Sequence, residues 1–254
     1  MCLVLIAYRQ LPETPLLVAA NRDEFHARPT AALHWWPDTP GILAGRDLEA
    51  GGTWLGMSRN GRFACVTNYR DAVPPGTGLR SRGELITRFL EAQATPREFL
   101  ANLDGERYAG FNLFVADGQT LAYGNNQGAE PRELRSGIYA LANASLDVPW
   151  HKTRIARTSL QNLVAARAAD SGRLFEVLGN RQTAPAGAAA KEHPQSTRAE
   201  ALSAPFIVQP DYGTRSSTTV LVTANGDVEI TERRYAPDGA AEGENRQGFR
   251  IEPL

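Results

Sequence analysis

The chain has 254 residues, of which 42% are hydrophobic and 22% are charged, and its formal net charge is −1. This length allows one large domain or two small ones, and the composition is that of a soluble globular protein. No domain-wide basic footprint is present, which argues against a nucleic-acid partner. Two cysteines are too few for a disulfide framework, and no apolar run approaches the ~18 residues needed to span a bilayer. The first apolar run lacks the basic flank of a secretory signal, so we expect a cytoplasmic protein without a transmembrane segment.

The N-terminal half has the pattern of a series of strands. Apolar runs at residues 3–7 and 16–20 are separated by a proline-bearing turn. An Asn-Gly pair at residues 60–61 lies between two further apolar runs and predicts a hairpin. Asp117-Gly118 and residues 224–227 predict a second and a third hairpin by the same reasoning.

Helix signals lie between these hairpins. Capping boxes that begin at Ser81 and at Thr95 predict the starts of two helices. Residues 150–169 have the spacing of the longest helix, and residues 173–178 have that of a short one.

The order of elements is strands, helices, strands, helices, strands. It predicts a single α+β domain of residues 1–254, built from two packed antiparallel sheets that are covered by helices. Residues 184–204, rich in alanine and polar residues, are expected to be a mobile insertion within this domain.

Cys2 is the most informative residue, because it directly follows the initiator methionine. Removal of Met1 would leave a thiol and a free α-amine on the same residue. The amine can accept the thiol proton near neutral pH, so nucleophile and base would come from one residue. The alternative is a small buried hydrophobe in a first strand.

Ionisable residues follow the second apolar run, at Arg22, Asp23 and Glu24. Adjacent strands bring their ends together, so Arg22 is expected to lie beside Cys2, where a guanidinium stabilises a thiolate. Asp23 is a candidate to orient Arg22 or the α-amine. The alternative is a solvated turn, because consecutive charges are costly to bury without partners.

Asparagines close several predicted strands, and one arginine lies at the start of a late strand. Asn68, Asn112 and Asn143 are either turn residues or amide donors to an oxyanion. Arg215 follows Gly213 and is flanked by hydroxyl residues, which is typical of an anion-binding turn or of a plain strand start.

Metal and nucleotide sites have little support in the sequence. The histidines show no ligand spacing, and no GxGxxG or GxxxxGK[ST] motif occurs, so we expect no metal centre and no nucleotide site. The adjacent Trp35 and Trp36 are expected to pack in the core or at its rim.

Motifs spread from Met1 to about Glu232 are jointly characteristic of one family. They are Met1-Cys2, Ala20-Asn21-Arg22-Asp23-Glu24-Phe25 with Arg28-Pro29, Gly51-Gly52-Thr53-Trp54-Leu55-Gly56, Thr67-Asn68-Tyr69, Arg82-Gly83-Glu84-Leu85, Gly110-Phe111-Asn112-Leu113, Leu141-Ala142-Asn143-Ala144, Pro149-Trp150-His151-Lys152 and Tyr212-Gly213-Thr214-Arg215. Through them the chain resembles the NRDE-domain family, also called the transport and Golgi organisation protein 2 family.

The resemblance implies an N-terminal-nucleophile hydrolase fold, a four-layer αββα sandwich, distantly similar to the cholylglycine and penicillin amidase branch. It implies that Cys2 is nucleophile and base, and that Arg22 and Asp23 support it. Asn68 and Asn143 would then be the oxyanion donors. Arg215 would take the part of that branch's late arginine. One departure is the adjacency of Arg22 and Asp23, which that branch spaces more widely, and it leaves the role of Asp23 open.

The resemblance also implies a non-catalytic alternative, since members of the family are implicated in haem trafficking and in lipid or acyl-CoA homeostasis. No cofactor is required for the hydrolase. If haem binds, Cys2 and His151 are the first axial-ligand candidates. Three hypotheses stay open: hydrolysis of a small amide or thioester, binding of haem or an acyl ligand whose carboxylates are held by Arg22 and Arg215, and a scaffold without a small ligand.

Overall fold

The computed structural model describes residues 2–70, 79–194 and 196–252. The chain divides into two compact units, which are discontinuous in sequence. Unit 1 comprises Met1–Ala27, Ser136–Ala142 and Leu146–Gly248, and unit 2 comprises Arg28–Arg135, Asn143–Ser145 and Phe249–Leu254. Whether the whole chain behaves as a single domain stays a prediction.

Unit 1 is built on a six-stranded sheet with the order β10-β1-β2-β11-β12-β13. Its strands are β1 (Cys2–Leu11), β2 (Thr14–Phe25), β10 (Gly137–Leu141), β11 (Tyr212–Val222), β12 (Asp227–Tyr235) and β13 (Ala241–Arg250). The pairings from β10 to β12 are antiparallel, and the β1–β2 and β11–β12 hairpins follow the turns that the sequence predicts. The predicted turn between residues 7 and 16 and the hairpin predicted at residues 224–227 are therefore confirmed.

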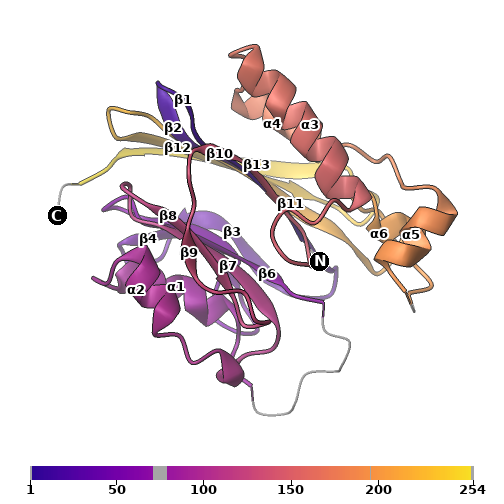
Figure 1. Ribbon diagram of the computed structural model, residues 1–254, viewed down its shortest axis with the longest axis horizontal. Coiled ribbons are helices and arrows are strands. Elements are labelled where there is room, and N and C mark those ends of the chain that lie inside the picture. The colour runs from indigo at the N-terminus through magenta and orange to yellow at the C-terminus, as the bar shows by residue number, and fades with distance from the viewer. Residues whose placement is uncertain (1, 71–78, 195, 253–254) are drawn as a thin grey trace. The chain divides into compact units, whose positions relative to one another are not determined.

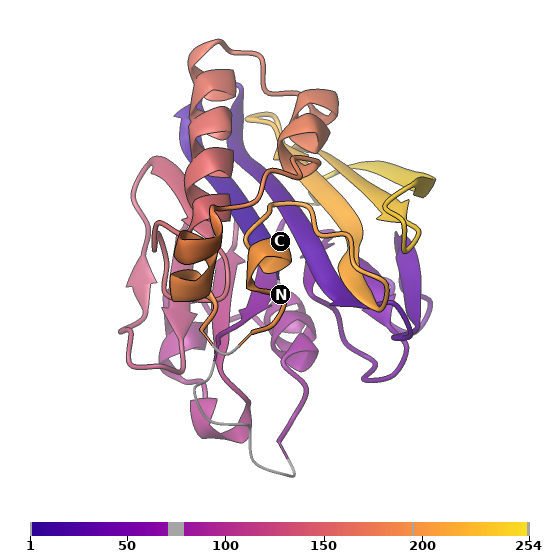
Figure 2. The same cartoon turned by 90° about the vertical axis from the view of Figure 1, so that its right-hand side faces the viewer.

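One face of this sheet is covered by helices α3 (His151–Ala165) and α4 (Ser171–Leu178). Figure 2 shows α3 running beside the indigo strands β1 and β2. Side chains alternate along a strand, so only every second residue can reach these helices. The residues that do so include Leu3, Leu5, Leu17 and Ala19 on the sheet and Ala156, Leu160, Leu174 and Phe175 on the helices. We call this side the helix-covered face and the other side the Cys2 face.

The structure corrects the predicted ends of two elements in unit 1, strand β2 and helix α3. β2 does not end at Ala20 but continues to Phe25, so the NRDE motif lies inside the strand and not in a solvated turn. The long helix ends at Ala165, before Arg167 takes a positive φ of 50°.

The predicted insertion at residues 184–204 contains helices α5 (Ala186–Glu192) and α6 (Ala199–Leu202). It also buries His193 and Ser203. Its mobility stays a prediction.

Unit 2 is built on a seven-stranded antiparallel sheet with the order β3-β4-β5-β6-β7-β8-β9. Its elements are β3 (Thr30–Trp35), β4 (Ile42–Asp47), β5 (Leu55–Ser58), β6 (Phe63–Asn68), β7 (Phe111–Ala116), β8 (Leu121–Asn125), β9 (Arg132–Glu133), α1 (Gly83–Glu91), α2 (Pro96–Ala101) and the 3-10 turn Gly105–Arg107 (Figure 1). The predicted Asn60-Gly61 and Asp117-Gly118 hairpins are β5–β6 and β7–β8.

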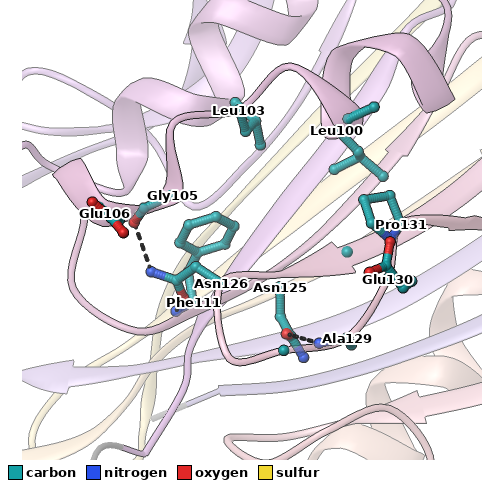
Figure 3. Close-up of a pocket in the computed structure, with 13 residues that line it drawn as sticks. Leu100, Leu103, Gly105, Glu106, Phe111, Asn125, Asn126, Ala129, Glu130 and Pro131 are labelled. Carbon is teal, nitrogen blue, oxygen red and sulfur yellow. Dashed lines mark hydrogen bonds between the residues drawn. The ribbon is translucent and has the colours of Figure 1, made fainter.

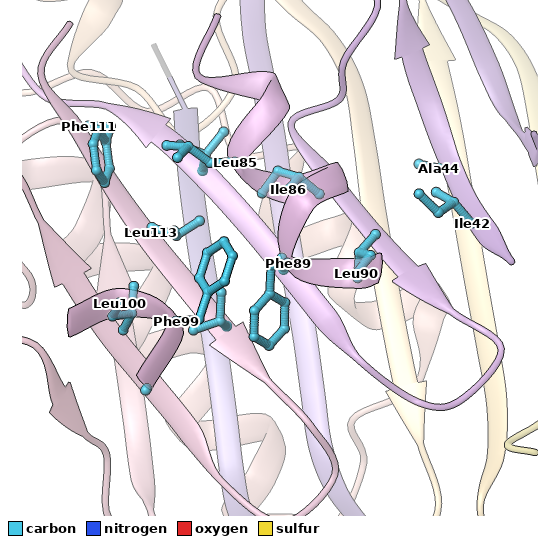
Figure 4. Close-up of a cluster of buried hydrophobic side chains, with 14 of the residues drawn as sticks. Ile42, Ala44, Leu85, Ile86, Phe89, Leu90, Phe99, Leu100, Phe111 and Leu113 are labelled. Atoms are coloured by element: carbon cyan, nitrogen blue, oxygen red, sulfur yellow. The ribbon is translucent and has the colours of Figure 1, made fainter. Parts of the chain in front are cut away.

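Helices α1 and α2 pack on this sheet through the apolar positions that the sequence pattern indicates (Figure 4). Phe89 of α1 meets Phe99 of α2 edge to face, with ring centroids 5.0 Å apart. Trp36 is buried in the same cluster, as expected.

The two capping predictions have different outcomes. Thr95 forms the expected capping box with Glu98. The box at Ser81 is wrong, because α1 begins after Arg82, which makes no side-chain cap. The Ser81 hydroxyl instead accepts from the N–H of Gly83, one residue before Glu84, the residue that the capping box would require.

The predicted fold class is confirmed in both units. Each contributes one antiparallel sheet, and helices flank both sheets, which is the α+β arrangement expected from the order of elements.

Candidate functional site

Cys2 and Arg22 face each other at the start of β1. Cys2 is the first residue of the strand and is directly opposite Arg22 on β2, which in turn is opposite Ser216 on β11. Directly opposite residues of antiparallel strands point to the same face, with Cβ atoms about 4.5–5.5 Å apart. The sequence expectation that Arg22 lies beside Cys2 is thus matched by the register. Arg22 is only 5% exposed, and its Nη2 lies 3.9 Å from Oε2 of Glu24.

Arg215 occupies an irregularity of β11 next to this row. Thr214 pairs with Asp23 and Ser216 pairs with Arg22, so Arg215 is an extra residue in the ladder. Such bulges re-aim side chains and are common next to functional sites. Nη1 of Arg215 donates to the carbonyls of Phe25 (3.0 Å) and His26 (3.1 Å), which fixes its guanidinium at the end of β2.

Asp23 lies on the opposite side of the sheet from Arg22. Its Oδ1 accepts from the Thr214 hydroxyl at 2.7 Å, and its Oδ2 lies 3.6 Å from Nζ of Lys152. Lys152 is the second residue of α3, and both charged side chains are fully buried. The contact with α3 assigns the Asp23 side chain to the helix-covered face, whereas Arg22 shares the Cys2 face. A supporting role of Asp23 toward the α-amine therefore stays a prediction.

Tyr212 joins the start of β11 to Asp23. Its hydroxyl donates to the Asp23 carbonyl at 2.9 Å. Burial raises the pKa of Tyr212 well above its ordinary value, and the nearby negative charges of Asp23, Cys2 and Glu24 raise it further, while Arg22 lowers it. Tyr212 is therefore a neutral hydrogen-bond donor beside these groups at physiological pH.

Two residues of this site were not among the sequence candidates, Asn21 and Lys152. The Asn21 side chain donates to the carbonyls of Leu178 (2.9 Å) and Pro205 (2.8 Å) and accepts from the Ser217 hydroxyl at 2.6 Å. It anchors the strand to the end of α4. The motifs that carry the family resemblance contain both residues, and this was the one signal that could have singled them out.

The predicted oxyanion donors Asn68 and Asn143 belong to unit 2 and meet there. Nδ2 of Asn143 donates to the main-chain oxygen of Asn68 at 2.7 Å, and the Asn143 carbonyl accepts from Arg70. Asn143 is 1% exposed, whereas Asn68 is exposed at the end of β6. Asn112 is fully buried and bonds to Thr67, so it holds the sheet together.

The axial-ligand candidates Cys2 and His151 are not brought together. His151 begins α3, which packs on the helix-covered face, and its main-chain N–H donates to Glu192. One haem iron bound by both residues is not favoured by this arrangement. Within the described residues, no three His, Cys, Asp or Glu side chains are arranged to hold a metal ion, and no helix there is long and apolar enough to cross a membrane.

A cavity of about 340 Å³ lies within unit 2, beside the turn that follows α2 (Figure 3). Its apolar wall includes Leu100, Leu103 and Phe111. The side-chain amides of the two asparagines that line it form hydrogen bonds with the surrounding main chain: Asn126 donates to the Gly105 carbonyl, and Asn125 accepts from the Ala129 N–H. None of the predicted catalytic residues lines this cavity.

Comparison with known proteins decides the family. Residues 1–237 match the family described as Transport and Golgi organisation 2. The chain belongs to this family. Its relatives include the Transport and Golgi organization protein 2 homologs of Bos taurus, 35% identical with 92% of each chain covered, and of Homo sapiens, 33% identical with 97% of each covered. The resemblance inferred from the motifs is confirmed.

Solved structures with the same fold are N-terminal-nucleophile hydrolases. The ortholog of N-acylethanolamine-hydrolyzing acid amidase from Caenorhabditis elegans has a TM-score of 0.50 at 13% identity and covers 87% of this chain and 92% of its own. A variant of conjugated bile acid hydrolase from Clostridium perfringens has a TM-score of 0.56 at 8% identity and covers 100% and 98%. At these identities the likeness establishes the fold alone.

Proposed function

We propose that this family member is an N-terminal-nucleophile hydrolase, in which Cys2 cleaves a small amide or thioester after Met1 has been removed. The observation that carries the proposal is the direct pairing of Cys2 with Arg22 at the start of β1. The buried guanidinium lies on the same face as the thiol, and positive charge beside a cysteine is typical of nucleophilic thiols.

The chemistry uses groups of the same residue. The α-amine of Cys2 takes the thiol proton, and the sulfur attacks the carbonyl carbon of the substrate. The carbon–nitrogen or carbon–sulfur bond then breaks, and the leaving group receives the proton from the amine. Water attacks the resulting acyl-enzyme thioester and releases the carboxylic acid and the thiol.

Supporting roles are assigned to the remaining candidates. Arg215, braced by the carbonyls of Phe25 and His26, adds positive charge near the bulge. The amides of Asn68 and Asn143 are the proposed donors to the oxyanion that forms on the substrate carbonyl. Asp23 is next to the partner of Cys2 in sequence, and we keep it as a candidate to orient the freed α-amine, although its carboxylate contacts Lys152 and Thr214.

The experiment combines mass spectrometry with acyl-enzyme trapping. Protein expressed in its natural host is weighed intact, and it is then quenched in acid after mixing with acetyl or octanoyl thioesters of N-acetylcysteamine. We expect the loss of Met1 and an acyl adduct on Cys2. Cys2→Ala abolishes both adduct and turnover, whereas Cys65→Ala, which alters the other, 1%-exposed cysteine, leaves them unchanged.

A variant with one alanine inserted between Met1 and Cys2 separates the thiol from the α-amine. We expect it to retain a reactive thiol and to lose turnover. Retention of Met1 in the natural host, or turnover by Cys2→Ala, contradicts the proposal.

The carrier alternative is tested in parallel by titration with haem. A Soret shift that is lost in Cys2→Ala or in His151→Ala, together with no thioester turnover by the processed protein, favours binding of haem over hydrolysis. The same titration on Arg215→Ala examines the proposed contact with haem carboxylates.

A further inference from the structure

The row that begins with Cys2 and Arg22 continues across the sheet. Ser216 is directly opposite Arg22 on one side and directly opposite Arg234 of β12 on the other. Residues that are opposite each other share a face, so Cys2, Arg22, Ser216 and Arg234 form one line across four strands of the Cys2 face. Neighbouring strands are about 4.8 Å apart, which puts Ser216 about 10 Å and Arg234 about 14 Å from Cys2 along this line.

Arg233 and Arg234 confirm the alternation of faces. The guanidinium of Arg233 lies 4.3 Å from the ring centroid of Phe175 on α4 and pairs with Glu244. It therefore belongs to the helix-covered face, and Arg234, the next residue, belongs to the Cys2 face. The two arginines differ in surroundings although they are adjacent in sequence.

The polar groups at the far end of the row lack partners among the residues that the structure describes. Oγ of Ser216, a residue that is 4% exposed, makes no hydrogen bond, and Nε of Arg234 is buried without one. Arg234 forms no ion pair with a described residue either, unlike Arg233. Buried polar groups are nearly always hydrogen-bonded in folded proteins, so a hydroxyl and a guanidinium left together indicate a bound group that accepts hydrogen bonds.

Gly243 on β13 provides the room for this guanidinium. A β-carbon added there would lie 3.0 Å from Nη2 of Arg234. Gly243 does not have a positive φ, so the backbone itself does not require glycine. Glycine inside a strand weakens it and often marks the close approach of another group, which here is the Arg234 side chain.

The charges along this part of the sheet leave an excess of one positive charge. Arg22, Arg215 and Arg234 contribute three guanidiniums, while Glu24 and the buried Glu232 contribute two carboxylates.

We infer that Ser216 and Arg234 form a subsite for an anionic group of the substrate, a carboxylate or a phosphate, about two to three strand spacings from the thiol of Cys2. This deepens the proposed function and rests on it, because it names the substrate class of the same site: an acyl amide or thioester that carries a negative charge remote from the bond to be cleaved. Arg234 is a specificity-determining residue and Ser216 adds a hydroxyl donor.

The test measures labelling of Cys2 by two alkylating reagents that differ in charge alone. The anionic reagent is 6-(iodoacetamido)hexanoate, and the neutral one is its primary amide. In both, the thiolate sulfur displaces iodide, so no acyl chemistry is involved. Adducts on Cys2 are followed by intact mass, and the ratio of the two rate constants is compared with the ratio measured for glutathione.

We expect wild-type protein to favour the anionic reagent about tenfold over the glutathione ratio, which corresponds to about 1.4 kcal/mol. Arg234→Gln should bring the ratio back toward that of glutathione, and Ser216→Ala should lower it in part. Arg233→Gln is the matched control, because it removes the same charge from the other face and should leave the ratio unchanged.

Gly243→Ala provides a second variant that keeps every charge. Displacement of the guanidinium should lower the ratio, and melting curves identify variants that fail to fold. The inference is overturned if Arg234→Gln and Gly243→Ala both fold and keep the wild-type ratio, or if Arg233→Gln lowers it equally. A selective label on a protein that retains Met1 and turns over no thioester supports the subsite and contradicts the proposed hydrolase, so the two failures are distinguishable.

The same labelling method distinguishes a carboxylate subsite from a phosphate subsite. Repeating the measurement with a phosphate monoester of the same length as the carboxylate shows which of the two groups Arg234 prefers.

Discussion

The two faces of the six-stranded sheet differ in the kind of polar group that they hold, and Arg22 and Asp23 of β2 show it within two residues. Arg22 shares its face with Cys2, Ser216 and Arg234, in a row that includes unpartnered polar atoms. Asp23 shares its face with helix α3, where Lys152 and Thr214 contact its carboxylate. Contacts on the Asp23 face fix the helix to the sheet, whereas the Cys2 face holds the residues that we propose to meet a ligand.

The largest effect is expected from Asp23→Asn, which tests the structural face. The change leaves the fully buried ammonium of Lys152 without a counter-charge, and breaking a buried pair in this way costs about 3–5 kcal/mol. Urea denaturation measures the loss. Glu24→Gln is the comparison on the Cys2 face, where the Glu24 carboxylate is partly exposed. It should lower the free energy of unfolding by less than about 1 kcal/mol.

A double variant sharpens this result. Asp23→Leu combined with Lys152→Met removes both charges and should recover most of the stability, because well-packed apolar residues often replace buried pairs without loss. An equally large loss in the double variant would show that Lys152 is not the reason for the cost.

The adjacent serines of β11 give the next comparison. Ser217→Ala removes the 2.6 Å hydrogen bond to the buried Asn21 side chain on the helix-covered face, and we expect a loss of about 1–3 kcal/mol in unfolding free energy. Ser216→Ala removes a hydroxyl that makes no hydrogen bond to any residue the structure describes, and it should be nearly neutral. Equal losses in the two variants would mean that the faces do not differ in this way.

Arg22→Gln examines the reactive face. Removal of the guanidinium beside Cys2 should slow alkylation of its thiol by iodoacetamide about tenfold, or about 1.4 kcal/mol in activation free energy, because positive charge beside a cysteine increases its reactivity. The adduct is measured by intact mass at pH 7. Arg233→Gln, on the helix-covered face, should leave the rate unchanged. An unchanged rate in Arg22→Gln would remove Arg22 from the proposed machinery.

The smallest effect concerns Tyr212 at alkaline pH. Its pKa is raised in the folded state, mainly by burial, so the fold favours the protonated phenol. Its contribution to stability is complete below the unfolded pKa of about 10 and is lost as pH rises through the folded pKa, by no more than about 1.4 kcal/mol per pH unit. Urea midpoints between pH 8 and 11 should fall less steeply in Tyr212→Phe than in the wild type. Parallel slopes would contradict this assignment.

Local patterns predicted much of the fold. The hairpins at Asn60-Gly61 and Asp117-Gly118 form as expected, because turn residues and alternating apolar runs act over short distances. The capping box at Thr95 forms for the same reason. β13 was missed, because its sequence is polar and it forms through pairing within the sheet and not through an apolar pattern of its own.

The sequence by itself determined the family and the α+β class, and it singled out Cys2 and Arg22 as candidates, because ordered motifs and short-range patterns carry that information. Only the tertiary structure decided that Asp23 turns toward Lys152 and that the Cys2 row extends to Arg234. The physical reason is strand register: a shift of one residue moves a side chain to the other face of the sheet, and the two hairpins β1–β2 and β11–β12 are aligned by the pairing of β2 with β11, which are far apart in the chain.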